Sequence, residues 1–429
     1  MINRYEVEEI SKLWTDESRF GFYLKVELAH LETLEDSGLV PKGTAAKMRN
    51  AKIDPKRIAE IEKTTGHDVI AFCTSVTEQY AAEDGRFFHF GITSSDVIDT
   101  AHSLLMRETM GIIKKDLHAL GEALQVKAKE TSDLLCIGRS HGIHAEAMVF
   151  GQKFLSFYSE LKRRQMDWDH CLCDLTGQLS GAVGSYTVVS PEMEEQTLKR
   201  LSLKVEPVST QVIPRDRYAL TIAVGGLIAT LLERMSTEFR LLQHSDVDEV
   251  KEGFSKGQKG SSTMPHKKNP ISSENIAGLS RLIRSHVTPA FENCALWHER
   301  DISHSSVERM MLPDHFGLLS YTLRRMRNVV ENLVIDRERI EAKVANNEKI
   351  YSSYVLHQLI QGNPQIKREE LYEVVQTSFF NSKTKDELKK NLVSELDARK
   401  IKHQAQSWID FESLRKHYQT QYRKIEKRL

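Results

Sequence analysis

The chain has 429 residues, and its 60 lysines and arginines are balanced by 60 aspartates and glutamates. A chain of this length is too long for one ordinary core and fits two or three packed units. Because the formal net charge is +0, there is no bulk positive field to hold nucleic acid or an anionic membrane, and neither is expected as a partner.

The cysteines and the apolar stretches indicate the compartment. Five cysteines are scattered along the chain, an odd set that fits reduced cytosolic thiols better than a disulfide framework. Cys171 and Cys173 form the one close pair, and without a second pair they do not predict a zinc site. The N-terminal residues lack the apolar core of a signal peptide, and the apolar run 219–232 is short for a membrane span. We expect a cytoplasmic protein without a metal or cofactor.

The chain in order predicts three helical regions. Residues 1–93 are broken by glycine and proline and are typical of a separate N-terminal domain. No proline occurs from Lys56 to Ser190, so this region predicts unusually long helices over 96–131 and 146–175. A third helix, over 215–250, contains the apolar run 219–232 and is expected to be covered on most sides. This central domain spans 94–345, and a C-terminal domain spans 346–429 with shorter helices at 368–380 and 411–429. Strand signals are weak and are confined to 203–212.

The apolar faces of the long helices predict the assembly. Helices this long and this apolar rarely complete their burial inside one subunit, and a bundle shared between chains covers the faces that a monomer would expose. The predicted fold is therefore all-α, with three helical domains and a central long-helix bundle that forms the core of a homotetramer.

The loop within 252–270 carries the most specific motif of the chain. Residues 256–270 read KGQKGSSTMPHKKNP and combine glycines, which permit close backbone approach, with serine hydroxyls and lysine ammonium groups for anionic oxygens. The string GSSTMPHKKNP resembles the signature of the fumarase/aspartase superfamily. The resemblance implies elimination of fumarate from a succinyl-type substrate.

A second motif lies before the predicted helix 146–175. His141 stands on a turn flanked by Gly138 and Gly142, where an imidazole can reach a ligand. A metal pair of His141 with His144 is disfavoured, because no third ligand occurs at a recognisable spacing. Taken with the loop, His141 and the two histidines His67 and His89 indicate acid–base and phosphate-binding groups.

Elimination defines the roles that these residues can take. Ser261 is the candidate general base, because loop N–H groups and the Lys267 ammonium could stabilise its alkoxide. His141 is the candidate general acid for the leaving nitrogen, and Glu274 is available to orient it if the fold brings them together. Lys267 and Asn269 would also hold the carboxylate whose charge grows in the transition state.

The flanking strings narrow the resemblance. GRSHGIHAE, SGAVGSY, STQVIPRDRYA and LWHERDISHSSVERMMLPD, together with Arg4-Tyr5, resemble the bacterial-type adenylosuccinate lyases over roughly the first 350 residues. The resemblance implies that fumarate is eliminated from N6-(1,2-dicarboxyethyl)-AMP to give AMP, and from succinylaminoimidazole carboxamide ribotide to give the free carboxamide. It also implies that the small-molecule substrate is bound at sites shared between subunits of the tetramer.

The resemblance also implies the substrate-binding residues. The family positions that surround the substrate match Arg4, Tyr5, His67, Asp68, His89, Thr93, Ser94, Gln211, Lys267, Asn269, Arg300, Ser305 and Arg309. Thr93 and Ser94 would take a succinyl carboxylate, and His89, Ser305 and Arg309 would take the 5′-phosphate. Whether His67 is catalytic or only orients the substrate stays open. Ser140, Ala147 and Gly66 depart from the family pattern without removing any of these groups.

Two alternatives are disfavoured by particular residues. Another superfamily member, such as an argininosuccinate lyase, would not require the phosphate-site string HSSVER or His266. A helical scaffold without catalysis would not require Ser261, His141 and Lys267 together.

Overall fold

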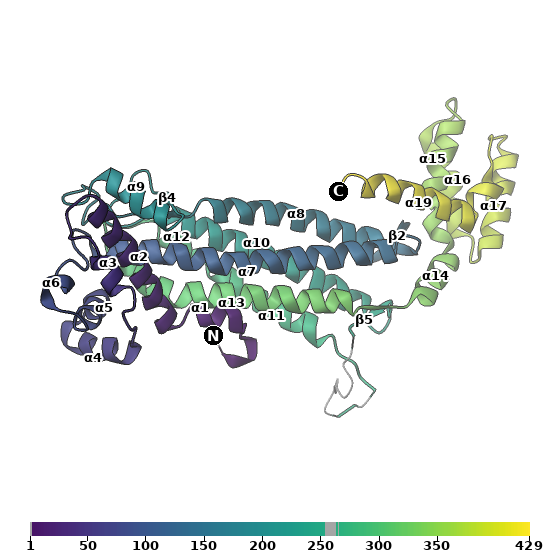
Figure 1. Ribbon diagram of the computed structural model, residues 1–429. Helices are drawn as coiled ribbons and strands as arrows, with labels where there is room; N and C mark the ends of the chain where they lie inside the picture. Colours follow the sequence, from purple (N-terminus) through teal and green to yellow (C-terminus); the bar gives the residue numbers. More distant parts are fainter. Residues whose placement is uncertain (1, 254–262, 265) are drawn as a thin grey trace. The chain divides into compact units, whose positions relative to one another are not determined.

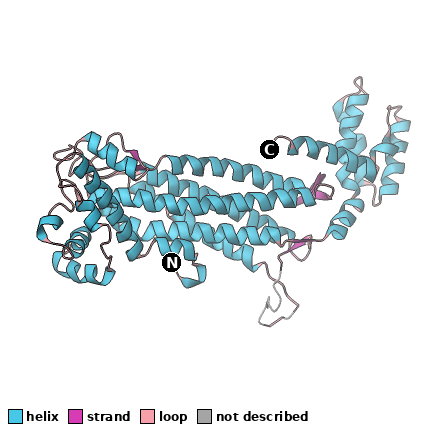
Figure 2. Cartoon of the chain, viewed as in Figure 1, coloured by secondary structure: helices cyan, strands magenta, loops and turns pink. Residues whose placement is uncertain are grey.

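The computed structural model describes residues 2–253, 263–264 and 266–429. Helices make up most of this part of the chain, and the strands are short (Figure 2). The all-α class predicted from the sequence is therefore confirmed. Contacts between Cα atoms divide the chain into a first unit, Met1–Ala119, Arg163–Glu233 and Asn275–Arg325, and a second unit, Leu120–Lys162, Arg234–Glu274 and Met326–Leu429.

The elements are labelled in Figure 1. The helices up to residue 242 are η1 (Asn3–Tyr5), α1 (Glu8–Leu13), α2 (Asp16–Asp36), α3 (Thr44–Met48), α4 (Pro55–Thr65), α5 (Asp68–Thr77), α6 (Ala82–Gly85), α7 (Ser94–Glu130), α8 (Gly151–Cys173), α9 (Pro191–Arg200) and α10 (Asp216–Leu242). The later helices are α11 (Ile271–Ser285), α12 (Val287–Glu292), α13 (Ser303–Glu331), α14 (Arg337–Ala345), η2 (Glu348–Tyr351), α15 (Ser352–Gly362), α16 (Arg368–Phe380), α17 (Lys385–Ala398), α18 (Ala405–Trp408) and α19 (Phe411–Glu426).

Six short strands pair two by two. The antiparallel pair β1 (Leu135–Ser140) and β2 (Ile143–Val149) is the longest. The others are the parallel pair β3 (Thr176–Gly177) with β4 (Lys204–Val205) and the antiparallel pair β5 (Val250–Lys251) with β6 (Val334–Ile335).

The predicted long helices are present, but some boundaries differ: the helix predicted to reach Val250 ends at Leu242. Helices α7 and α10 lie within two residues of the predicted N-terminal bounds, and α16 has the predicted bounds. The helix predicted to start at Glu146 starts instead at Gly151, because Glu146 belongs to β2. The hairpin was missed because its strands are short and lie between two long stretches with helical periodicity. Helix α13 was also missed; it contains Pro313, a residue that usually interrupts a helix.

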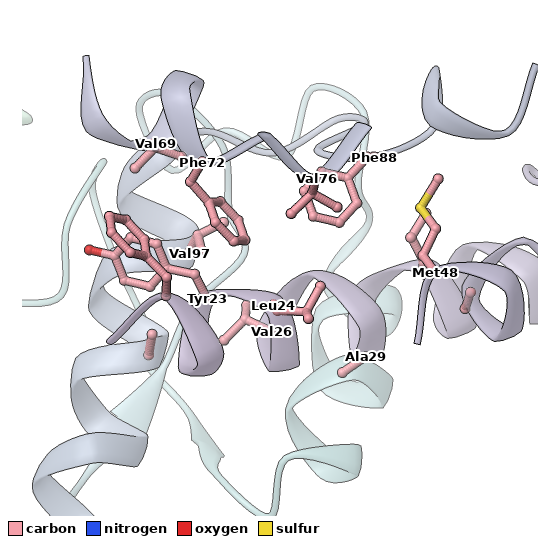
Figure 3. Close-up of a cluster of buried hydrophobic side chains, with 14 of the residues drawn as sticks. Tyr23, Leu24, Val26, Ala29, Met48, Val69, Phe72, Val76, Phe88 and Val97 are labelled. Carbon is pink, nitrogen blue, oxygen red and sulfur yellow. The ribbon is translucent and has the colours of Figure 1, made fainter. Parts of the chain in front are cut away.

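The N-terminal part of the first unit has an aromatic core between α2 and α5 (Figure 3). The rings of Phe20 and Phe72 stack with their centroids 5.8 Å apart, and Tyr23 meets Phe72 edge-on at 5.7 Å. Gly66 ends α4 in the left-handed conformation, with φ 63°, and His67 then caps α5. Glycine adopts this conformation at little cost, so two helices can be joined here without a longer loop.

Helix α10 is the one described helix long and apolar enough to cross a membrane. Of its most apolar window, 67% is buried inside the protein. This burial is typical of the core helix of a water-soluble protein.

Within the first unit, segments of α7, α8, α10 and α13 lie side by side (Figure 1). The indole nitrogen of Trp168 in α8 donates to the carbonyl of Met110 in α7, at 3.1 Å. Gly225 of α10 lies directly against the buried imidazole of His315 in α13. The absence of a side chain at Gly225 therefore allows α10 and α13 to approach closely.

Replacing Gly225 by alanine should destabilise the protein by about 1–3 kcal/mol, the usual cost of overpacking a core. The added Cβ would lie 2.1 Å from Nε2 of His315. The His315 ring is buried, so it has little room to move out of the way. Gly278→Ala in α11 is the matched control, because nothing lies within 4 Å of its added Cβ and the helix should gain stability. Urea denaturation of both variants measures the difference, and equal effects would contradict the packing argument.

Candidate active site

The second unit presents His141 at the tip of the β1–β2 hairpin. Ser140 pairs with Ile143, which leaves His141 and Gly142 as the two turn residues. Both have positive φ, 54° and 77°, as the preferred turn of a two-residue hairpin requires. The imidazole of His141 is exposed, at the turn that the sequence predicted.

Ion pairs within the second unit fasten this hairpin. Arg139 of β1 donates from two nitrogens to the carboxylate of Glu249, at 2.5 and 3.2 Å. Lys343 of α14 contributes a third contact to Glu249, at 3.2 Å. Burial opposes the charge on Glu249, but the hydrogen bonds and positive charges of Arg139 and Lys343 lower its pKa. On the other strand, Nδ1 of His144 lies 2.9 Å from the amide nitrogen of Asn347. The turn is therefore held at both flanks.

A cavity of about 890 Å³ in the second unit contains three of the predicted residues, Lys267, Asn269 and Glu274. Its other charged lining residues are Arg240, Asp248, Lys251 and Lys268. Cationic side chains outnumber carboxylates on its walls, so the cavity suits an anionic ligand. Ser261 lies outside the described residues, as do most of its neighbours in the loop. His141 and Glu274 both lie in the described part of the chain, and no hydrogen bond or ion pair joins them there.

In the first unit, His67, Asp68 and Arg309 come together at the start of α5. Nδ1 of His67 caps the helix by accepting from the N–H of Ile70, at 3.4 Å. Arg309, from the first turns of α13, donates to the buried carboxylate of Asp68 at 2.5 Å. The side chains of His67 and Arg309 remain about half exposed, at 46% and 49%. An imidazole and a guanidinium thus both lie beside Asp68 and remain accessible to solvent.

His89 follows α6 in a left-handed conformation, with φ 62°. Both its backbone N–H and its ring contact the buried carboxylate of Glu27, the ring at 2.7 Å. Burial by itself lowers the pKa of His89, but the hydrogen bond and charge of Glu27 outweigh it and raise the pKa above the ordinary value. A cationic His89 is suited to an anionic ligand.

Thr93 lines a second cavity in the first unit, of about 390 Å³, together with Ser180 and Gly181. Ser94, the next residue in the chain, begins α7 and is largely buried. Asp96 accepts from the backbone N–H groups of Thr93, at 2.8 Å, and Gly181, at 3.2 Å. Burial raises the pKa of Asp96 to about 7, against the lowering effect of these N–H donors. Asp96 therefore ties together two walls of the cavity.

The remaining predicted residues lie on several segments of the first unit. The amide of Gln211 donates to the carbonyl of Ala182 at 2.8 Å, and its oxygen accepts from Arg300 at 2.7 Å. Arg4 is exposed in η1, and the ring of Tyr5 packs 5.2 Å from that of Tyr321. Ser305 lies half-buried in the first turn of α13. The predicted residues are thus divided between the two units.

Comparison with known proteins decides the family. A family model described as lyase matches residues 3–284. Curated adenylosuccinate lyases from Thermotoga maritima and Staphylococcus saprophyticus are each 45% identical, over 88% and 89% of this chain and 87% and 89% of theirs. The chain belongs to the lyase family. A Bacillus subtilis adenylosuccinate lyase, 44% identical over 88% of this chain and 87% of its own length, is a further relative of this lyase.

Solved structures share the fold of this lyase at low sequence identity. A fumarate lyase from Mesorhizobium sp. BNC1 has a TM-score of 0.81 at 20% identity, covering 96% of this chain and 99% of its own. A 3-carboxy-cis,cis-muconate lactonizing enzyme from Pseudomonas putida has a TM-score of 0.83 at 22% identity, covering 98% of each chain. At this identity the likeness concerns the fold alone.

Sequence reasoning missed several buried charged residues of the first unit. Arg215 is buried between Asp99 and Glu308, with nitrogen–oxygen distances of 2.7 Å to each. Glu27 and Asp96 were also not predicted, although each contacts a predicted residue. The one sequence signal was the presence of a carboxylate on an otherwise apolar helix face, which is rare without a partner.

Glu27→Gln should lower the pKa of His89 to below the ordinary histidine value. The amide removes the negative charge that raises this pKa, whereas the burial that lowers it remains. In the wild type, the raised pKa contributes stability that is complete below the unfolded value, near 6.5, and is lost as the pH rises through the folded value. NMR titration of labelled imidazoles measures the pKa of His89 in the wild type and in the variant.

Glu32→Gln, also on α2, is the control, because Glu32 pairs with Arg49 and not with a histidine. The assignment of Glu27 fails if the two variants leave His89 with the same titration midpoint.

Proposed function

We propose that this lyase is an adenylosuccinate lyase, which eliminates fumarate from N6-(1,2-dicarboxyethyl)-AMP and from succinylaminoimidazole carboxamide ribotide. The observation that carries the proposal is identity of 44–45% to curated adenylosuccinate lyases over nearly nine-tenths of the chain. The cationic cavity around Lys267 and the His67, Asp68 and Arg309 cluster agree with a substrate that carries carboxylates and a phosphate.

The elimination needs a base, an acid and groups that hold the developing charge. Ser261 removes the proton from the carbon next to a carboxylate, and electron density then accumulates on that carboxylate. Lys267 and Asn269 stabilise this charge. His141 protonates the leaving nitrogen, which departs with the nucleotide as the C–N bond breaks and fumarate forms. The exposed turn and its fastened flanks support this role, because the imidazole is accessible while its backbone is held.

Substrate binding is assigned to the first-unit residues. Thr93 and Ser94 hold a succinyl carboxylate at the N-terminus of α7, because the N-terminal end of a helix favours an anion. His89, Ser305 and Arg309 hold the 5′-phosphate. A cationic His89, supported by Glu27, and the half-exposed Arg309 guanidinium suit this anion. Arg300 and Gln211, which are joined by a hydrogen bond, bind the substrate together. Glu274 orients the acid in the assembled enzyme.

The working enzyme is proposed to be a cytoplasmic homotetramer that needs no cofactor. Large apolar side chains on the long helices remain exposed in the single chain, including Val126 at 55%, Met166 at 72% and Leu241 at 59%. Contact between copies would cover such residues. The sites of this tetramer are proposed to draw His141, Ser261 and Thr93 from different subunits.

Fumarate release, followed by its ultraviolet absorbance, tests the function. The purified protein should release fumarate from the succinylated adenine nucleotide and from the succinylated carboxamide ribotide, and not from argininosuccinate. Release from argininosuccinate alone would assign a different lyase. No release from any of the three would contradict the elimination altogether.

A further inference from the structure

Three side chains of the kinds that bind transition metals meet in the first unit. Glu27 of α2, Cys73 of α5 and His89 place one ligand atom each within 4.8 Å of one another. Nδ1 of His89 lies 2.7 Å from Oε1 of Glu27, whose side chain is fully buried. A carboxylate oxygen, an imidazole nitrogen and a thiol sulfur form a ligand set suited to Zn²⁺ and similar ions.

The hydrophobic core holds these ligands in place. Val26, Phe72 and Phe88, the residues immediately before the three ligands, belong to the buried cluster shown in Figure 3. Cys73 itself packs against this cluster. Ligands placed on packed elements keep their geometry when an ion enters, which is what a metal site requires.

The surroundings of the cluster favour a divalent cation. The Glu27 carboxylate is fully buried, and Cys73 is partly buried against the hydrophobic core. A bound cation would compensate both the carboxylate and a thiolate in this dry setting. His30 lies one helical turn after Glu27, with Nε2 2.9 Å from the carbonyl of Phe90. Its buried Nδ1 has no hydrogen-bond partner among the described residues, but His30 is not among the side chains whose ligand atoms lie within 4.8 Å of one another.

We propose that Glu27, Cys73 and His89 form a binding site for a borderline-soft divalent cation such as Zn²⁺ or Co²⁺. Binding replaces the hydrogen bond between His89 and Glu27 with a bond from each of them to the metal. The Cys73 thiol and the ring nitrogen of His89 release their protons to solvent, and a water completes the coordination. No atom changes oxidation state. The ion enters past His89, whose side chain is 17% exposed.

Occupation of this site would regulate turnover, an effect that rests on the proposed function. His89 is proposed to bind the substrate phosphate, and a metal ion bound to its ring would prevent the imidazole from contacting that phosphate. Zn²⁺ should therefore raise KM for the nucleotide, and a chelator should reverse the effect. Cys73→Ser should retain the basal activity and become insensitive to Zn²⁺.

Cobalt titration of the chelator-treated full chain tests the site without using activity. The wild type should bind one Co²⁺ per chain with a thiolate-to-cobalt charge-transfer band. Cys73→Ser should abolish the band and weaken binding at least about tenfold, since even the loss of an outer partner costs that much. Cys173→Ser is the matched control, because Cys173 is an exposed thiol outside the cluster, and it should leave the band unchanged.

Three results would overturn the site: no charge-transfer band in the wild type, a band that survives Cys73→Ser, or a band lost in Cys173→Ser. Because a change at a buried cysteine can disturb packing, alkylation of the wild type gives an independent measurement. Zn²⁺ should slow alkylation of Cys73 and not of Cys173, as resolved by mass spectrometry, and equal rates with and without Zn²⁺ would contradict the proposal. An enzyme that binds Co²⁺ but releases no fumarate would contradict the proposed function and leave the metal site standing.

Discussion

His141→Ala should lower kcat by at least about 100-fold, the lower range for removing a positioned general acid. The variant should fold normally, because the imidazole is exposed and the hairpin is held by Arg139 and Asn347 rather than by His141. Steady-state kinetics of fumarate release measures the loss, and thermal melting checks the fold. His118→Ala, which removes an exposed imidazole of α7, is the control and should lose far less. Near-normal turnover in His141→Ala would remove the acid from its assigned role.

Ser261→Ala should be similarly inactive, and mixing the two inactive variants tests whether sites are shared. If His141 and Ser261 act from different subunits, unfolding and reassembling equal amounts of the two variants rebuilds some intact sites. Each required residue then comes from an intact chain half of the time, so about a quarter of the sites should be wild type under closed symmetry. Hybrid tetramers confirmed by mass spectrometry that stay as inactive as either parent would show that both residues act from one chain.

Arg215→Met should destabilise the protein by about 3–5 kcal/mol, because it leaves two buried carboxylates without their shared counter-ion. The side chains of Arg215, Asp99 and Glu308 are 1%, 2% and 3% exposed. Burial already raises the pKa of Glu308 to about 7, although Arg215 lowers it. Without Arg215, the folded pKa of both acids rises. The loss of stability should therefore increase as the pH rises, since acids with raised pKa values destabilise the fold once they ionise.

Urea denaturation at several pH values measures this loss. Arg57→Met is the control, because Arg57 pairs with Glu78 at the surface and such pairs contribute about 0–1 kcal/mol. A stability of Arg215→Met within about 1 kcal/mol of the wild type at neutral pH would show that the buried ion pairs are not required.

Local patterns in the sequence were sufficient for α7, α10 and α16 and for the turn at His141, but not for α13. The absence of proline and the helical spacing of apolar residues predicted α7 and α10, because helix formation depends on neighbours three and four residues apart. The His141–Gly142 turn was predictable because a turn is specified by the residues within it. The β1–β2 hairpin was not, since its strands are stabilised by pairing with each other rather than by a local period.

The sequence by itself determined the helical architecture, the turn that carries His141 and, through its motifs, the family. Only the tertiary structure decided which charges meet, as where Arg215 joins Asp99 to Glu308 and where Glu27 meets His89. These partners are far apart along the chain, and no spacing rule connects them. They are brought together by the packing of apolar helix faces, and burial then makes each unpaired charge costly, so their pairing depends on which helices become neighbours.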